Sequence, residues 1–314
     1  MTAAELRSAA SALENIALRT PLVKAPSLSQ IAGQEVRLKA EQLQPIGAFK
    51  IRGAWTAVNR LSPADRARGI ITHSSGNHGR ALAWAGQRAG LRTVVVMPDT
   101  APDIKVAAVR ALGAEVVLVS GPASERGRVA VELSESQGLV LIPPYEHPDV
   151  ILGQATATLE IFDSWPEVEA VVAPVGGGGL LAGACLAALA VKPEATVIAV
   201  EPVGAAKLSA ALDAGHPVPL HHTASLADGL LPMQIGAIPF ATIEGCVRTV
   251  VTVTDAQISA GVRFLFTELG MKVEPSGAVT VAAVLAGLID LTGPTALILS
   301  GGNVDPDLFA KLLQ

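Results

Sequence analysis

The sequence predicts an α/β protein built on doubly wound, mainly parallel sheets, and three observations support this class. The chain has 314 residues and is 50% hydrophobic, which is enough material for a large core. Short β-branched runs alternate with alanine-rich stretches of helical length. The short runs are almost continuously apolar, as in parallel strands that are covered on both faces. By length, about two domains of roughly 150 residues are expected.

The predicted elements follow one another in a regular order. Strands are expected at residues 36–40, 69–72, 93–97, 115–118, 139–142, 170–174, 196–201 and 296–299. Helices are expected between them at 79–89, 105–112, 126–136 and 180–190, with a further helix within 152–162. The proline-rich stretch 143–149 separates one strand–helix series from the next, and the polar stretch 215–231 crosses the surface between elements.

The composition excludes several classes of function. The mean hydropathy is +0.46, but the most apolar stretches, 180–191 and 278–289, are shorter than the roughly 20 residues of a membrane span. A net charge of −5 and few aromatic side chains disfavour nucleic-acid binding. The N-terminus lacks the apolar run of a secretion signal. Cys185 and Cys246 are predicted to be buried free thiols of a cytosolic protein.

The segment THSSGNHG at 72–79 joins a predicted strand to a predicted helix. The backbone N–H groups at a helix N-terminus carry about half a positive charge and attract anions. An ordinary helix cap needs only one serine or asparagine. Two serines, an asparagine and a histidine together therefore favour a site for a carboxylate or a phosphate.

Four consecutive glycines, at 176–179, stand between a predicted strand and a predicted helix. Such a run costs chain entropy, and close approach of the backbone to a phosphate explains why it is present. The run also fits the dinucleotide pattern G-x-G-x-x-A through Gly177, Gly179 and Ala182, with Glu201 where a ribose-binding acid would lie. A nicotinamide-dependent oxidoreductase is therefore an alternative at this point.

Two further segments complete the candidate chemistry. Ser300, in LSGGN after the last predicted strand, offers one neutral hydrogen bond to a ligand. Lys50, in GAFKIRGA, is expected one turn into a helix, near the positive end of its dipole and beside Phe49 and Ile51. Desolvation and positive potential both lower the pKa of a lysine, as a Schiff-base amine requires. A solvated surface lysine is the alternative that this segment leaves open.

Taken in order, these segments resemble the threonine dehydratase and serine racemase family of pyridoxal-phosphate enzymes, which has the tryptophan synthase β-like fold type II. The matching pieces are GAFKIRGA at 47–54, SSGNHG at 74–79, VGGGGL at 175–180 and SGGN at 300–303. Supporting matches are ILGQATATLE at 151–160, AVEP at 199–202, ADG at 227–229 and VEPSGA at 273–278. The resemblance extends over nearly the whole chain.

The resemblance implies a pyridoxal phosphate cofactor and a role for each matching residue. Lys50 would hold the cofactor as a Schiff base, Phe49 would pack against its ring, and Asn77 would bond the ring hydroxyl. The phosphate would lie on the glycine run, which comprises Gly176, Gly177, Gly178 and Gly179. Ser300 would face the pyridine nitrogen. The substrate carboxylate would be received by Ser74, Ser75 and His78, and by Arg126 in SERGRVA.

The resemblance also implies a reaction. A serine beside the pyridine nitrogen leaves that nitrogen largely neutral, so loss of a β-hydroxyl competes well with reprotonation of Cα. We expect Lys50 to remove the Cα proton of a small β-hydroxy amino acid, L-threonine or L-serine, giving a 2-oxo acid and ammonia. Ser75 would permit racemisation from the opposite face, whereas Tyr145, where racemase-like members often have asparagine, favours the dehydratase. Serine racemase and hydroxyaspartate dehydratase remain alternatives.

The chain departs from cation-dependent members of this family after AVEP. Those members supply two carboxylates and a carbonyl to a divalent ion there. Glu201 and Ala205 match, but Lys207 stands in place of the second carboxylate, so we expect an internal ion pair and no metal. His221 and His222 lack the helical spacing of a zinc site. Because the sequence ends at Gln314, no C-terminal regulatory domain and no feedback by isoleucine are expected.

The resemblance finally implies the domain organisation. A larger domain would combine residues 1–62 and 148–314, a smaller one would be inserted at 63–147, and the cofactor would lie in the cleft between them. A cytoplasmic homodimer is expected, with a small amino acid as its partner and no nucleic acid or membrane. A catalytically idle amino-acid-binding module is a third alternative, which Lys50 disfavours because binding alone does not require it.

Overall fold

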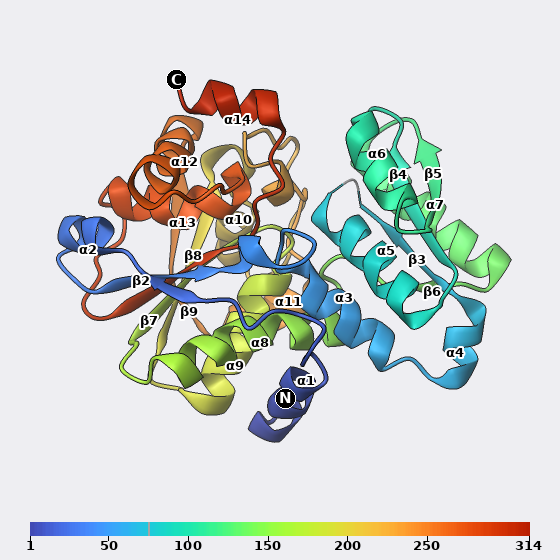
Figure 1. Cartoon of the computed structure of the whole chain (residues 1–314), viewed down its shortest axis with the longest axis horizontal. Coiled ribbons are helices and arrows are strands. Elements are labelled where there is room, and N and C mark those ends of the chain that lie inside the picture. Colours follow the sequence, from blue (N-terminus) through green and yellow to red (C-terminus); the bar gives the residue numbers. More distant parts are fainter. Residues whose placement is uncertain (75) are drawn as a thin grey trace.

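Two separate sheets organise the chain in the computed structural model, which describes residues 1–74 and 76–314 (Figure 1). The six-stranded sheet has the order β1-β2-β10-β7-β8-β9, and the four-stranded sheet has the order β5-β4-β3-β6. All neighbouring strands pair in parallel except β1, which runs antiparallel to β2. The predicted fold class, α/β with mainly parallel sheets, is confirmed.

The strands of the six-stranded sheet are β1 (Leu22–Lys24), β2 (Val36–Ala40), β7 (Ala170–Pro174), β8 (Thr196–Pro202), β9 (Val247–Val253) and β10 (Thr295–Leu299). The strands of the four-stranded sheet are β3 (Ile70–His73), β4 (Thr93–Pro98), β5 (Glu115–Val119) and β6 (Val140–Leu141). The prediction missed two strands, both at sheet edges. The short β1 gave little signal. In β9, by contrast, six of the seven residues are valine or threonine and the seventh is an arginine, so this β-branched content could have predicted the strand.

The helices of the first half are α1 (Ala3–Ser11), α2 (Pro26–Ala32), α3 (Lys50–Asn59), α4 (Pro63–Arg68), α5 (Asn77–Ala89), α6 (Asp103–Arg110) and α7 (Ala123–Gln137). Those of the second half are α8 (Pro148–Ser164), α9 (Gly179–Val191), α10 (Lys207–Ala214), α11 (Ala237–Ile243), α12 (Asp255–Leu269), α13 (Pro275–Leu285) and α14 (Pro306–Leu312). Three 3₁₀ turns complete the set, at η1 (Glu41–Leu43), η2 (Val203–Ala205) and η3 (Asp228–Leu230). No helix of the described chain is long and apolar enough to cross a membrane.

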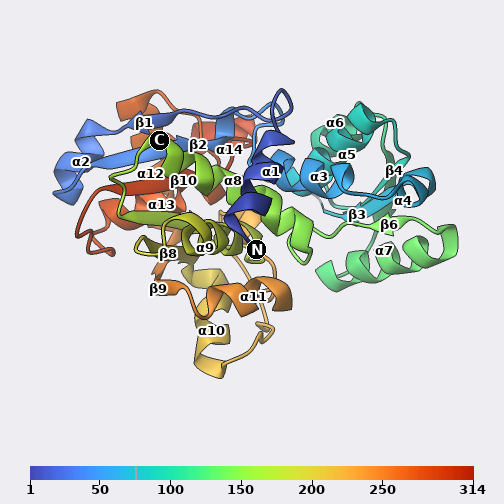
Figure 2. The same ribbon diagram turned by 90° about the horizontal axis from the view of Figure 1, so that it is seen from below.

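Side-chain alternation along the central strands explains why they read as continuously apolar. In β7, Val171 and Ala173 belong to a core cluster with residues of α8 and α9, whereas Val172 belongs to a second cluster with residues of α12 and α13. Both faces of the sheet are therefore buried, and helices cover them in Figures 1 and 2. The chain ends N and C both lie on the side of the six-stranded sheet (Figure 2).

Helix α3 lies between the two sheets (Figure 1). Its Ile51, Ala54 and Val58 share an apolar cluster with Ile70 of β3 and with residues of α5, and the helix also packs against α8. It thus contributes to the core on the side of the four-stranded sheet. The division into a larger domain (1–62 with 148–314) and a smaller one (63–147) remains a proposal. Helix α3 packs on elements of both, so it could be assigned to either domain.

Candidate active site

Backbone hydrogen bonds bring the segments around Lys50 and Ser300 together. Ala48 and Gly301 form an isolated antiparallel bridge, and the Phe49 N–H donates to the Ser300 carbonyl at 3.0 Å. From the other sheet, Asn77 at the start of α5 is reached by the Nδ2 of Asn303, which donates to its Oδ1 at 2.8 Å. Three of the four predicted segments therefore meet at the carboxyl ends of β3 and β10.

Lys50 is the first residue of α3 rather than one turn into it. Its Nζ donates to the Pro144 carbonyl at 2.7 Å and lies 5.0 Å from the centre of the Phe49 ring. Burial lowers the pKa of Lys50 to about 8. The amine therefore loses its proton far more readily than a solvated lysine, which is the condition for a nucleophile or a base.

Tyr145 connects the glycine run to Lys50. It follows Pro144, whose carbonyl binds Lys50, and its side chain packs on the glycine run. A Cβ on Gly177 would overlap the Tyr145 ring, and a Cβ on Gly179 would lie 3.1 Å from the Tyr145 Cβ. Gly178 has a φ of +97°, and a Cβ there would meet Pro239 at 2.8 Å. Close packing thus explains each glycine locally, and the run still presents backbone N–H groups at the start of α9, where an anion is favoured.

The segment before α5 carries the predicted carboxylate site. The Ser74 Oγ accepts from the Gly76 N–H at 3.3 Å, and Ser75 lies outside the described residues. The His78 ring is buried, with Nε2 at 3.0 Å from the Ile142 carbonyl, and burial and Lys50 lower its pKa to about 3. A neutral ring that donates to Ile142 has no second N–H, so the predicted role of His78 rests on its backbone N–H.

Arg126 lies in α7 near His73, at the end of β3. The Arg126 guanidinium lowers the pKa of His73, in addition to the larger effect of burial. Within the part of the chain that the structure describes, the buried Nε of Arg126 has no hydrogen-bond partner. Burial also lowers the pKa of Arg126 itself. A half-buried guanidinium with an unused donor suits an anionic ligand.

Ser300 is buried at the end of β10, and its hydroxyl makes a long contact of 3.4 Å with the Ser276 carbonyl. The Ser276 Oγ accepts from the Gly229 N–H at 2.9 Å, and the Gly229 carbonyl lies against Gly176. Ser276 therefore connects Ser300 to the glycine run. Sequence reasoning assigned no role to Ser276 or to its neighbour Glu274, although both lie in the VEPSGA match.

Lys207 and Glu201 are both fully buried beneath the glycine run. The Lys207 Nζ donates to the carbonyls of Ala205 at 2.7 Å and Val175 at 3.2 Å, and lies 3.9 Å from Glu201 Oε2. The Glu201 carboxylate accepts from the N–H groups of Leu208 and Ser209 and from the Ser209 hydroxyl. Because these contacts consume the Glu201 oxygens, Glu201 is not free to bind a ribose, which argues against the nicotinamide alternative.

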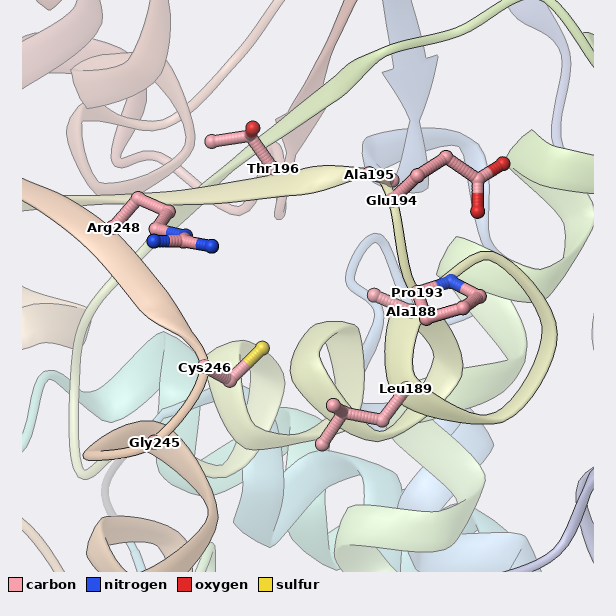
Figure 3. Close-up of a pocket in the computed structure, with 9 residues that line it drawn as sticks. All are labelled: Ala188, Leu189, Pro193, Glu194, Ala195, Thr196, Gly245, Cys246 and Arg248. Atoms are coloured by element: carbon pink, nitrogen blue, oxygen red, sulfur yellow. The ribbon is translucent and has the colours of Figure 1, made fainter.

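A separate hollow lies between the end of α9, the start of β8 and the turn before β9 (Figure 3). Cys246 and Arg248 both point into it. Cys185 is buried as predicted, but Cys246 is only partly buried, because the turn that carries it is open to this hollow. Neither the Lys50 segment nor the glycine run lines the hollow, so it is distinct from the candidate active site.

Comparisons with known proteins identify the family of the chain. A family model described as pyridoxal-phosphate dependent enzyme matches residues 13–301. The L-threonine ammonia-lyase of Thermotoga maritima is 37% identical over 315 residues, covering 100% of this chain and 78% of that protein. The L-threo-3-hydroxyaspartate ammonia-lyase of Saccharomyces cerevisiae is 34% identical over 314 residues, covering 100% and 96%. The structure of maize serine racemase has a TM-score of 0.94 at 32% identity, covering 99% and 96%.

Proposed function

The chain belongs to the family of pyridoxal-phosphate dependent enzymes that includes threonine dehydratases, hydroxyaspartate ammonia-lyases and serine racemases, and we propose that it is a dehydratase acting on L-threonine or L-serine. The family predicted from the sequence segments is thereby confirmed. The observation that carries the proposal is the partly buried Lys50 amine, which lies beside the Phe49 ring and bonds the Pro144 carbonyl, and whose pKa is lowered to about 8 by burial.

The residues present fit pyridoxal phosphate. The glycine run leaves backbone exposed at the N-terminus of α9 for a phosphate, and Phe49 beside Lys50 offers an aromatic face for a flat ring. The neutral Ser300 hydroxyl suits an uncharged pyridine nitrogen, and Asn77 suits a ring hydroxyl. When bound, the cofactor supplies an electron sink that makes the Cα proton of an amino acid removable.

The remaining chemistry belongs to the chain. Lys50 would hold the cofactor, and its neutral amine would take the Cα proton of the substrate. The low pKa of Lys50 keeps a useful fraction of neutral amine near neutral pH. The backbone N–H groups of Asn77 and His78 at the start of α5, together with the Arg126 guanidinium, would hold the substrate carboxylate. The β-hydroxyl would then leave with a proton as water, and hydrolysis of the dehydrated amino acid by water would yield the 2-oxo acid and ammonia.

Two activities of relatives compete with this one. The yeast relative acts on threo-3-hydroxyaspartate, and the maize neighbour is a serine racemase. Tyr145 on the glycine run supports the dehydratase, whereas Ser75 would be the second base of a racemase. A cytoplasmic location and a homodimer belong to this proposal, and light scattering after gel filtration tests the dimer.

The direct test combines covalent mapping with product analysis. Purified protein should absorb as a lysine-bound cofactor, and borohydride reduction followed by peptide mass spectrometry should place that cofactor on Lys50. Lys50→Ala should abolish the absorption band and all turnover. Incubation with L-threonine, L-serine, D-serine and 3-hydroxyaspartate then decides between activities. A colourless protein that does not take up pyridoxal phosphate, or one that only interconverts serine enantiomers, would contradict the dehydratase.

A further inference from the structure

Glu274 is a buried carboxyl at the meeting point of the two sheets. It precedes α13 as its N-cap and is 4% exposed. Its Oε1 accepts from the Asn77 Nδ2 at 2.8 Å, and its Oε2 accepts from the Asn303 N–H at 3.0 Å. Glu274 thus binds one residue at the start of α5 and another just after β10.

No basic side chain of residues 1–74 or 76–314 forms an ion pair with Glu274. The charged groups that face it are Asp228 from η3 and Lys105 from α6, which pair with each other at 3.0 Å. Burial and Asp228 raise the pKa of Glu274 to about 7, against the opposing effects of Asn77, Asn303 and Lys105. A buried carboxyl without a cation costs stability, so its presence calls for a role.

The Asn77 amide is held at both ends. Its Nδ2 donates to Glu274, and its Oδ1 accepts from Asn303, whose Nδ2 also donates to the Ile46 carbonyl at 2.9 Å. This fixes which way the amide faces. The Asn77 nitrogen keeps a second hydrogen, which is the one that a ligand in the site would receive.

A proton on Glu274 weakens this arrangement. Both of its oxygens accept from N–H donors, and a carboxylate forms stronger, charge-assisted bonds to them than a neutral carboxylic acid does, whose O–H also competes for the same space. The Asn303 donor is backbone and cannot turn, but the Asn77 amide can rotate. Protonation would therefore release or turn the Asn77 amide.

We propose, building on the proposed function, that Glu274 is a positioning residue whose carboxylate orients the Asn77 amide toward the cofactor, and that proton uptake by Glu274 releases it. The raised pKa places this exchange near neutral pH. The site thereby contains a titration that is independent of Lys50 and His78. Glu274 acts through Asn77 and does not itself take a proton from the substrate.

The first test uses the cofactor-free protein and follows its melting temperature between pH 5 and pH 8. The folded chain keeps the Glu274 proton up to about pH 7, whereas the unfolded chain loses it near its ordinary pKa of 4.5. Glu274 therefore costs stability as the pH rises through that window. Wild type should lose roughly 5 °C relative to Glu274→Gln over this range. Glu167→Gln, a change at an exposed carboxyl, is the matched control and should follow wild type.

The second test follows Asn77 itself. In protein labelled with ¹⁵N at asparagine, the Asn77 side-chain resonance of wild type should shift with a midpoint near pH 7, and Glu274→Gln should remove that midpoint. With pyridoxal phosphate bound, the absorption band should show the same pH dependence in wild type and Glu167→Gln but not in Glu274→Gln.

Two outcomes would overturn the proposal. If the melting temperatures of wild type and Glu274→Gln depend on pH in the same way, Glu274 does not titrate in this range. If the Asn77 resonance does not change with pH, the charge of Glu274 does not control the Asn77 amide. Failure to bind pyridoxal phosphate would instead contradict the proposed function, and the cofactor-free measurements would still decide the role of Glu274.

Discussion

Two buried charged regions flank Lys50, and they differ in how their charges are balanced. Behind α3, a charge cluster made of Lys39, Glu41, Arg52 and Glu160 holds two cations and two anions. Arg52 binds both oxygens of Glu41 at 2.8 Å and reaches Glu160 at 2.7 Å, while Lys39 lies 2.6 Å from Glu160. In front of α3, Glu274 has hydrogen-bond donors but no paired cation in the described chain.

This difference indicates that the charge cluster has a structural role and that Glu274 has a role in the active site. In the charge cluster, burial raises the pKa of Glu41, but Arg52, Lys39 and the Thr20 hydroxyl together outweigh burial and keep that pKa below its ordinary value. Glu41 thus stays charged near neutral pH, and its ion pair with Arg52 fixes the start of α3. At Glu274 burial prevails and the pKa rises, so the group changes charge where an enzyme works. A buried ion pair therefore fixes the structure of the site, whereas a buried carboxyl without a cation changes its charge with pH.

The largest effect is expected from breaking the balanced region. Arg52→Met leaves two buried carboxylates facing Lys39 alone, which should lower the free energy of unfolding by about 3–5 kcal/mol. Urea denaturation followed by tryptophan fluorescence measures this loss. Arg52→Lys keeps the charge but not the forked geometry, and should lose less. If Arg52→Met stays within about 1 kcal/mol of wild type, the cluster is not what fixes α3.

An intermediate effect on stability is expected at Lys207, whose charge is partly balanced by Glu201 at 3.9 Å. Burial lowers the pKa of Lys207 to about 8 although Glu201 opposes the shift. Lys207→Met removes the donor to the Val175 and Ala205 carbonyls, which should cost about 1–3 kcal/mol and loosen the glycine run, so cofactor affinity should fall as well.

Lys207 and Glu201 also allow a test of whether the protein depends on a divalent cation. Because the Lys207 ammonium already binds two carbonyls beside Glu201, we expect chelation of divalent ions to leave the melting temperature and the cofactor affinity of wild type unchanged. A large loss on chelation that magnesium restores would show that the ammonium does not replace a metal ion.

The sequence predicted those features that depend on local pattern. The apolar strands follow from local pattern, as do the helices predicted at 79–89 and 180–190, which begin at Asn77 and Gly179 in the structure. The resemblance of the ordered motifs implied that the Lys50 and Ser300 segments meet. What it could not predict depends on long-range packing. Tyr145 on Gly177 and Glu274 on Asn77 join residues far apart in sequence, and nothing local to Glu274 distinguishes it from a surface helix cap.

The smallest effect on stability is expected in α7, which carries Arg126 and Arg128. These two arginines show the same contrast between a paired and an unpaired charged group. Arg128 is 55% exposed and pairs with Glu125 and Glu132, whereas Arg126 is half-buried with an unpartnered Nε in the described chain. Neither Arg126→Ala nor Arg128→Ala should change the melting temperature measurably, since solvent and salt screen the Arg128 pairs. Steady-state kinetics should separate them. Arg126→Ala should raise KM about tenfold through loss of one charge-assisted contact to the substrate carboxylate, while Arg128→Ala keeps wild-type KM. Equal KM values in the two variants would remove Arg126 from the carboxylate site and leave that task to the N-terminus of α5.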